Sequence, residues 1–314
     1  MMRLFIYALL SSAYGLTPLQ PITHVFSEYQ DVCNVLALSG GGSFGAVQMG
    51  MMDGLLETNS IPNTYDIITG ISAGGLNAGF LSYSTSIVDA LPEIKSIYAN
   101  LTTDKVYVYD ILHIFSEYSV YNTAPLRNTL AEIVASRTPI TNGPITIVGS
   151  TNVNQQILDV FRFDTAPAAD RINMLMATSA IPLAFPPLVT NGITYVDGGI
   201  ISNEMIQQAV GQKSCGFFNF TFISAAPKTP VNATIDGLYS YITALGALIL
   251  NTFDYPLAEY ENAKCIDAPR GIIQACFPTS PSISQYSILD FDYGSILYEL
   301  GRVGGTHCVS YNYC

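Results

Sequence analysis

The sequence predicts an α/β fold in which helices cover a mainly parallel β-sheet. Short apolar runs typical of strands alternate with helix-like stretches, and the clearest strand runs end in glycine-rich turns. Only 11% of the 314 residues are charged, whereas an average soluble protein carries about 25%. Strands covered on both faces are nearly continuous apolar runs, so such a sheet explains part of this composition.

The expected elements follow one another in βα order. A first strand over residues 35–38 leads through glycines to a helix over 46–57, and a second strand over 65–69 leads to another helix. Later strand-like runs occupy residues 145–149, 194–196 and 217–223. We expect a single domain over residues 16–314, with the motifs in about 35–225 and a C-terminal extension over about 226–314.

The charge balance excludes two classes of protein. The chain has 12 basic and 24 acidic residues, for a formal net charge of -12. Disordered polyelectrolytes combine high charge with little apolar content, which this chain lacks. Nucleic-acid binding needs a clustered Lys/Arg surface, so no nucleic-acid partner is expected.

The first 15 residues are typical of a secretory signal peptide. A short basic start at Arg3 precedes an unbroken apolar run over 4–10, and small residues follow at 11–15. That run is too short to span a membrane, which takes about 20 residues. The uncharged stretch 237–253 is also too short, so we expect a buried or interfacial helix there and no transmembrane segment. The expected location is outside the cell or in the lumen of the secretory pathway.

Six cysteines agree with an oxidising compartment. No C-x-x-C pair occurs, so disulfides are favoured over a zinc cluster. Cys33 and Cys215 each lie two residues before a strand-like run, and adjacent parallel strands would bring them to the same edge of the sheet. We therefore expect them to pair. The other expected pairs close local loops: Cys265–Cys276 and Cys308–Cys314.

Three N-x-[ST] sequons also fit a secreted glycoprotein. They lie at Asn100, Asn219 and Asn232. Asn219 falls inside an expected strand, where a glycan would be occluded. Sequons arise by chance, so they add only modest weight.

A glycine loop is the first of three segments that carry chemistry. Residues 38–45, LSGGGSFG, connect the first strand to the first helix. Glycines there allow several backbone N–H groups to point at one spot beside a helix N-terminus, which favours binding of negative charge. Gly40, Gly42 and Gly45 also satisfy the G-x-G-x-x-G pattern of dinucleotide-binding folds. That function needs an acidic residue where the second strand ends, whereas Asp66 opens this strand, so it is disfavoured.

The second segment is a G-x-S-x-G motif at residues 70–74. A nucleophile elbow places its serine, here Ser72, on a strained strand-to-helix turn flanked by glycines such as Gly70 and Gly74. The alternative, in which Ser72 only caps a helix, is chemically reasonable for the motif alone. Small residues continue along both helices, which predicts close helix approaches to the sheet and the glycine loop. They are Gly75, Ala78 and Gly79 on one helix and Ala46, Gly50 and Gly54 on the other.

The third segment is a strand that ends in Asp197, Gly198 and Gly199. In isolation, an aspartate followed by two glycines is typical of a turn. Asp197 follows Ser72 in an α/β chain, however, and a nucleophilic serine needs a base to accept its proton. Asp197 is the candidate for that base.

Together these segments resemble the patatin-like phospholipase family. The resemblance covers about residues 35–225 and has its motifs in family order: 35–42 with Gly45 and Gly50, then 70–74, then 197–199. Residues 121–127 also resemble the family segment Y-x-x-x-P-L-R. Residues 177–182, with 185–187, resemble the block before the catalytic Asp. The resemblance implies a three-layer α/β/α fold and a lipid acyl hydrolase of the phospholipase A or lysophospholipase type.

The resemblance also implies how such a site works. Ser72 would be the nucleophile and Asp197 the base, with no histidine, cofactor or metal. Backbone N–H groups of the glycine loop would hold the oxyanion, at Gly41, Gly42 and Ser43. The supporting motif glycines are Gly40, Gly45, Gly70, Gly74, Gly198 and Gly199. The family often has Arg where this chain has Phe44, so the oxyanion hole is expected to depend on the backbone, without anchoring by an Arg side chain.

Two alternatives remain open from the sequence. The chain order Ser72, Asp197, His307 fits an α/β-hydrolase esterase, although that fold's nucleophile follows more strands and His307 adjoins Cys308. The second alternative is a secreted binding or storage glycoprotein that has this fold but is inactive or catalytically weak. For an enzyme, the expected partner is a lipid or acyl ester, in solution or at a membrane surface. The candidate acyl-contacting residues are Ile181, Leu183, Phe185, Pro186, Pro187 and the aromatic stretch 106–121.

Overall fold

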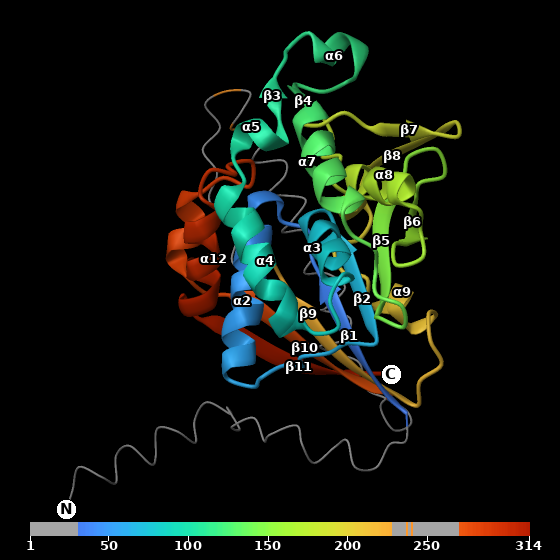
Figure 1. The fold of residues 1–314 in the computed structure, drawn as a ribbon, viewed down its shortest axis with the longest axis vertical. Coiled ribbons are helices and arrows are strands. Elements are labelled where there is room, and N and C mark those ends of the chain that lie inside the picture. Colours follow the sequence, from blue (N-terminus) through green and yellow to red (C-terminus); the bar gives the residue numbers. More distant parts are fainter. Residues whose placement is uncertain (1–30, 228–236, 238–239, 241–269) are drawn as a thin grey trace, which may run out of the picture.

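The computed structural model describes residues 31–227, 237, 240 and 270–314, and its centre is a twisted β-sheet between helices (Figure 1). Within that part of the chain the strand order is β11-β10-β9-β1-β2-β5-β8-β7, with β6 pairing with β5 as well. The strands β10, β9, β1, β2 and β5 run parallel to one another, and the flanking pairs are antiparallel. The predicted α/β fold with a mainly parallel sheet is confirmed.

The strands over 35–38, 145–149 and 194–196 are longer than expected, the one over 65–69 is shifted by two residues, and the one over 217–223 has the expected bounds. The strand bounds are β1 Val32–Leu38, β2 Ile67–Ile71, β5 Ile145–Asn152, β6 Ile157–Arg162, β7 Leu188–Thr190, β8 Ile193–Asp197, β9 Phe217–Ile223, β10 Gly271–Pro278 and β11 Thr306–Tyr313. A separate short hairpin pairs β3 (Val108–Tyr109) with β4 (Tyr121–Asn122). Strands β10 and β11 lie in the C-terminal extension, where no strand was expected, and they continue the same sheet.

Helices lie on both faces of the sheet, as a three-layer fold requires. The longer ones are α2 Gly45–Glu57, α3 Ala73–Leu81, α4 Ile87–Asn100, α7 Ala124–Ala135, α8 Ala168–Thr178 and α12 Gly294–Val303. The short ones are α5 Thr103–Val106, α6 His113–Ser116 and α9 Ile206–Val210. Alternate residues of β1 point to opposite layers: Leu36 packs with the core beneath α2, α4 and α12, whereas Val35 packs with Ile206 of α9.

The small residues of α2 have a different partner from the expected one. A Cβ at Gly50 would lie 1.9 Å from the carbonyl oxygen of Tyr298, and one at Gly54 would lie 2.6 Å from that of Arg302. Both carbonyls belong to α12, so these glycines let α12 pack against α2 backbone to backbone. The prediction that they bring α2 onto the sheet and glycine loop was wrong, because it left out the C-terminal helix.

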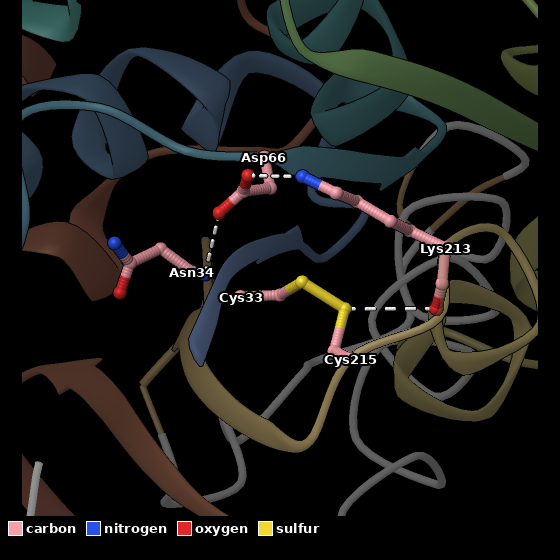
Figure 2. Close-up of a disulfide and its surroundings, with 5 residues drawn as sticks. All are labelled: Cys33, Asn34, Asp66, Lys213 and Cys215. Atoms are coloured by element: carbon pink, nitrogen blue, oxygen red, sulfur yellow. Dashed lines mark hydrogen bonds and ion pairs between the residues drawn. A yellow bond between two sulfur atoms is a disulfide. The ribbon is translucent and has the colours of Figure 1, made fainter. Parts of the chain in front are cut away.

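A disulfide and an ion pair lie at the amino-terminal ends of the parallel strands and connect them to neighbouring segments (Figure 2). Cys33 and Cys215 form the predicted disulfide beside the paired strands β1 and β9. Asp66, just before β2, accepts hydrogen bonds from the Asn34 backbone N–H at 2.9 Å and from Lys213 Nζ at 2.6 Å. Asp66 thus lies at the opposite end of the sheet from the glycine loop, which argues against a role in dinucleotide binding.

The two local disulfide predictions were wrong. Cys276 pairs with Cys308, and the two residues face each other across the antiparallel strands β10 and β11. This pairing excludes both Cys265–Cys276 and Cys308–Cys314, and it depends on the unexpected strands β10 and β11. Cys314 is also disulfide-bonded. Cys265 lies outside the described residues.

Several predicted features lie outside the described residues. These are the signal peptide 1–15, the sequon at Asn232 and nearly all of the apolar stretch 237–253. No helix in the part of the chain that the structure describes is long and apolar enough to cross a membrane. Asn100 is exposed at the end of α4, whereas the Asn219 side chain on β9 donates a hydrogen bond to Asn34.

Candidate active site

Ser72 occupies a strained turn between β2 and α3. Its backbone has φ 52° and ψ -125°, a conformation that L-amino acids rarely adopt. The flanking glycines are required by close packing, because a Cβ at Gly70 would lie 2.1 Å from the Gly74 carbonyl oxygen and one at Gly74 would lie 2.3 Å from that of Leu38. This geometry is that of a nucleophile elbow, and a residue that merely caps a helix has no need of it.

Strand β5 brings Asp197 to Ser72. The last residue of β2, Ile71, pairs with Gly149 of β5, and Asp197 pairs with the next residue, Ser150. Strand β6 occupies the other edge of β5 over the same residues, so β2 and β8 share one edge and approach each other end to end. Ser72 and Asp197 therefore meet although 125 residues separate them in the chain.

The Asp197 carboxyl is buried and interacts with two hydrogen-bond donors. Its Oδ1 accepts from the Gly199 backbone N–H at 2.8 Å, and the Ser72 side chain is its other hydrogen-bond partner. Burial raises the pKa of Asp197 from its ordinary 3.8 to about 6, and both hydrogen bonds oppose this rise. A carboxylate with a pKa near neutrality is a stronger base than an exposed one, which suits proton removal from a serine hydroxyl.

The 177–182 block, noted in the sequence analysis, holds both residues in place. Thr178 Oγ1 accepts a hydrogen bond from the Ser72 backbone N–H at 2.8 Å and donates one to the Gly149 carbonyl oxygen at 2.6 Å. The Ala180 carbonyl oxygen accepts from the Asp197 backbone N–H at 2.9 Å. One short segment thus positions the turn of the serine and the strand end of the aspartate. Residue-type patterns did not reveal this role of Thr178.

Replacing Thr178 with valine is expected to lower activity by about tenfold to a hundredfold. The substitution leaves the buried Ser72 N–H and the Gly149 carbonyl oxygen without a partner, and an unpaired buried polar group costs about 1–3 kcal/mol. The valine side chain has nearly the same shape, so packing is preserved. Thr178→Ser keeps the hydroxyl and is the matched control, expected to stay close to the parent. Steady-state hydrolysis and urea unfolding measured side by side check this result. Equal activity of the valine and serine variants would contradict the positioning role.

The glycine loop lies directly against Ser72. A Cβ at Gly40 would lie 2.9 Å from the Ser72 Cβ, and the Gly40 N–H donates to Asn203 Oδ1 at 2.7 Å. Within the described part of the chain, the backbone N–H groups of Gly41 and Gly42 have no hydrogen-bond acceptor. These two donors are therefore available to an oxyanion. Gly42 has φ +55°, so a side chain there would be strained.

Ser43, the third residue expected to donate to the oxyanion, already has hydrogen-bond acceptors in the protein. Its backbone N–H donates to the Ile288 carbonyl oxygen at 2.8 Å, and its Oγ donates to the Ser287 carbonyl oxygen at 2.8 Å. Ser43 instead anchors the loop to the segment before α12. This anchoring explains how the loop is held although Phe44, a buried core residue, stands where the family often has Arg.

A narrow apolar pocket opens at Ser72. It is lined by Gly42, Ser72, Ala73, Leu76, Tyr98, Leu101, Val106, Leu126, Ser179, Ile181, Phe185 and Phe291. Nearly all of these side chains are hydrocarbon or aromatic, so the pocket favours an acyl chain over a polar group. Among the described residues, no group of three or more His, Cys, Asp or Glu side chains is placed to hold a metal ion.

The residues expected to contact an acyl chain divide into three places. Ile181, Phe185 and Val106 line the pocket at Ser72. Pro186 and Pro187 line a separate cleft, and Leu183 is exposed. The aromatic stretch 106–121 is buried at its two ends, at Tyr107 and Tyr121, and exposed in its middle. The middle of this stretch is therefore not part of the pocket.

The structure does not support a triad with His307. This residue is exposed on β11, at the edge of the sheet, and β10, β9 and β1 lie between β11 and β2. Neighbouring strands are about 4.8 Å apart, so His307 is roughly 19 Å from the strand that precedes Ser72. The other described histidine, His113, lies in α6 beside Asp110 and Asn122.

Comparisons with known proteins agree with these motifs. A family model described as patatin-like phospholipase matches residues 36–210, more than half of the chain. The chain is 30% identical over 186 residues to a probable lipid hydrolase, 463L, of Invertebrate iridescent virus 6. This alignment covers 56% of this chain and 62% of that protein. The chain is also 24% identical over 236 residues to the uncharacterized protein R571 of Acanthamoeba polyphaga mimivirus. This alignment covers 70% of this chain and 76% of that protein. The chain thus spans less than two thirds of the iridescent virus protein.

Solved structures give weaker matches. VipD from Legionella pneumophila has a TM-score of 0.38 and 15% identity, with 89% of this chain and 68% of that chain covered. ExoU, in its heterodimeric complex with SpcU from Pseudomonas aeruginosa, has a TM-score of 0.33 and 12% identity, with 90% and 54% covered. The family-model match is therefore the stronger finding.

Proposed function

Because the chain belongs to the patatin-like phospholipase family, we propose that it is a lipid acyl hydrolase in which Ser72 and Asp197 form the catalytic dyad. The observation that carries the proposal is the buried contact between the Ser72 side chain and a carboxyl whose pKa is about 6. The apolar pocket at Ser72 supports an acyl substrate of the phospholipase A or lysophospholipase type.

The proposed reaction has two halves. Asp197 takes the proton of the Ser72 hydroxyl while Oγ attacks the ester carbonyl carbon, and the resulting oxyanion accepts hydrogen bonds from the Gly41 and Gly42 N–H groups. The carbon–oxygen bond to the alcohol then breaks, and the alcohol leaves with the proton from Asp197. In the second half Asp197 takes a proton from water, the hydroxide attacks the acyl-serine, and the fatty acid leaves as Ser72 regains its proton.

Covalent labelling tests this assignment. A fluorophosphonate probe is expected to label the parent protein and not Ser72→Ala, because the probe traps an activated serine. Ser179→Ala is the matched control, since Ser179 lines the same pocket but its Oγ donates to the Leu175 carbonyl oxygen at 2.7 Å. Fatty-acid release from phosphatidylcholine and from triacylglycerol is measured on the same samples to identify the lipid class.

Two results would overturn the proposal. Labelling that persists in Ser72→Ala would place the reactive serine elsewhere. A parent protein that is neither labelled nor able to release fatty acid, while still binding lipid, would favour the alternative of a secreted binding or storage protein.

A further inference from the structure

The hairpin formed by β3, α6 and β4 projects beyond the rest of the fold (Figure 1). It carries exposed apolar side chains. Six large apolar residues between positions 108 and 118 are exposed, and four of them are at least 65% exposed: Tyr109 65%, Leu112 70%, Phe115 84% and Tyr118 72%. Leu183 is 50% exposed and lies against the same hairpin through a bridge to Ser119. Contiguous apolar surface of this kind marks an interaction site.

The composition of this cluster fits the boundary of a lipid bilayer. Tyrosine rings are enriched at membrane–water interfaces, because the ring faces the acyl region and the hydroxyl remains hydrated. Phe115 in α6 and Leu112 just before it are of the residue types that form the apolar face of helices at membrane interfaces. The backbone polar groups of the hairpin are largely paired, for example through the β3–β4 ladder and through the Glu117 N–H, which donates to the His113 carbonyl oxygen at 2.7 Å.

We propose that this hairpin docks the protein on the surface of a zwitterionic phospholipid membrane, an inference that rests on the proposed lipid acyl hydrolase function. The charges favour a zwitterionic surface over an anionic one. Residues 104–122 contain one Lys, Lys105, and no Arg, whereas they contain three acidic residues, Asp104, Asp110 and Glu117. Docking on anionic lipid depends on clustered Lys and Arg, which this surface lacks.

A cleft at the base of the hairpin supports the same choice of lipid. It is lined by residues that include Glu117 and Arg127, one anionic and one cationic side chain. A zwitterionic headgroup carries a phosphate and an ammonium group, so its two charges complement these two side chains. The same cleft contains Pro186 and Pro187, which lie just beyond the pocket residue Phe185.

The hairpin is also continuous with the catalytic pocket. Val106, immediately before the hairpin, lines the pocket at Ser72. The Tyr107 ring packs against Tyr121 with centroids 4.4 Å apart and against Phe185 at 5.6 Å. The carboxyl ends of the parallel strands, where Ser72 lies, point toward the same end of the molecule as the hairpin (Figure 1). A membrane bound at the tip would therefore present its acyl chains on the side where the pocket lies.

Vesicle flotation tests the docking surface without depending on hydrolysis. The full chain with Ser72→Ala is the parent for binding, so that the result stands whether or not the protein is a hydrolase. Phosphatidylcholine vesicles are expected to float this parent, and the added pair Leu112→Asp and Phe115→Asp is expected to weaken binding at least about tenfold. Phe115→Trp should keep binding. Val88→Asp is the matched control, since Val88 is 51% exposed in the first turn of α4, away from the hairpin, where a carboxylate is tolerated.

Hydrolysis of a short-chain water-soluble ester by the Ser72-containing variants separates docking from catalysis. The hairpin pair is expected to retain this hydrolysis while losing activity on phosphatidylcholine vesicles. Three results would overturn the proposal: equal flotation of the parent and the hairpin pair, flotation only with vesicles that contain anionic lipid, or a dimer in light scattering that the hairpin substitutions convert to a monomer. The last result would show that a second copy of this chain covers the surface.

Discussion

Ser72→Ala is expected to lower kcat on a phospholipid substrate by at least about 10⁴-fold, because the covalent step loses its nucleophile while the pocket remains. Some rate above that of water is expected to survive, since the Gly41 and Gly42 N–H groups still stabilise an oxyanion formed by attack of water. Fatty-acid release under saturating substrate measures the loss. A variant that retains a tenth or more of the parent kcat would contradict the role of Ser72.

The backbone conformation of Ser72 gives a second measurable result. Alanine has a Cβ and keeps the strain of φ 52°, whereas glycine adopts this conformation without it. Ser72→Gly is therefore expected to be more stable than Ser72→Ala by about 1 kcal/mol, after allowance for the greater freedom of glycine in the unfolded chain. Urea unfolding of the two inactive variants measures the difference. If the two have equal stability, the turn is not strained.

The pH dependence of kcat/KM is expected to follow Asp197. A base must be deprotonated to act, so activity should rise with pH through an apparent pKa of about 6 and then level off. Asp197→Asn cannot accept the serine proton, and its activity is expected to be at least about 10³-fold lower. Rate profiles of the parent and the variant from pH 4.5 to 8.5 test both statements. A parent rate that is already nearly constant above pH 5 would mean that burial does not raise the pKa of the base.

The same carboxyl links activity to stability. The pKa of Asp197 in the folded protein is about 6, above the ordinary 3.8, so the folded state holds its proton more tightly than the unfolded chain. The stabilisation by the protonated form is fully present below about pH 4 and is lost as pH rises through 6. Above that pH the ionised carboxylate costs about 3 kcal/mol relative to a neutral group. Asp197→Asn should therefore gain stability relative to the parent between pH 4 and 8.

Urea unfolding at both pH values tests this gain. The exposed Asp104→Asn is the matched control and should show little change in its stability relative to the parent. A constant difference between Asp197→Asn and the parent across this range would rule out a raised pKa in the folded state. A gain in stability together with a loss of rate would identify Asp197 as a residue retained for chemistry at the expense of stability.

Local motifs in the sequence were sufficient to predict the backbone setting of most residues of the candidate site. The turn at Ser72 and the strand end at Asp197 are specified by neighbouring residues, such as the glycines at 70, 74 and 198. The Cys33–Cys215 disulfide could be predicted because both cysteines precede an apolar run of the sequence by two residues. In each case the information lies within a few residues of the feature.

Features that depend on distant residues could not be predicted in this way. The Ser43 side chain bonds to Ser287, 244 positions later, and no local pattern signals that contact. The same applies to Thr178, whose hydroxyl bonds to the Ser72 backbone 106 positions earlier. The aromatic stretch 106–121 was expected as a whole to contact an acyl chain, although its residues differ in burial. Its composition is uniform, but tertiary packing buries Tyr107 and Tyr121 and leaves Phe115 exposed.

The anchoring of the glycine loop by the Ser287–Ile288 segment has a consequence for biosynthesis. A growing chain that has passed residue 210 contains every motif of the family match, yet it lacks the carbonyl groups that hold Ser43. The anchoring of Ser43 and the packing of α12 against Gly50 both require residues 287–303 to have been made. We therefore expect the glycine loop to be fixed in place only late in synthesis.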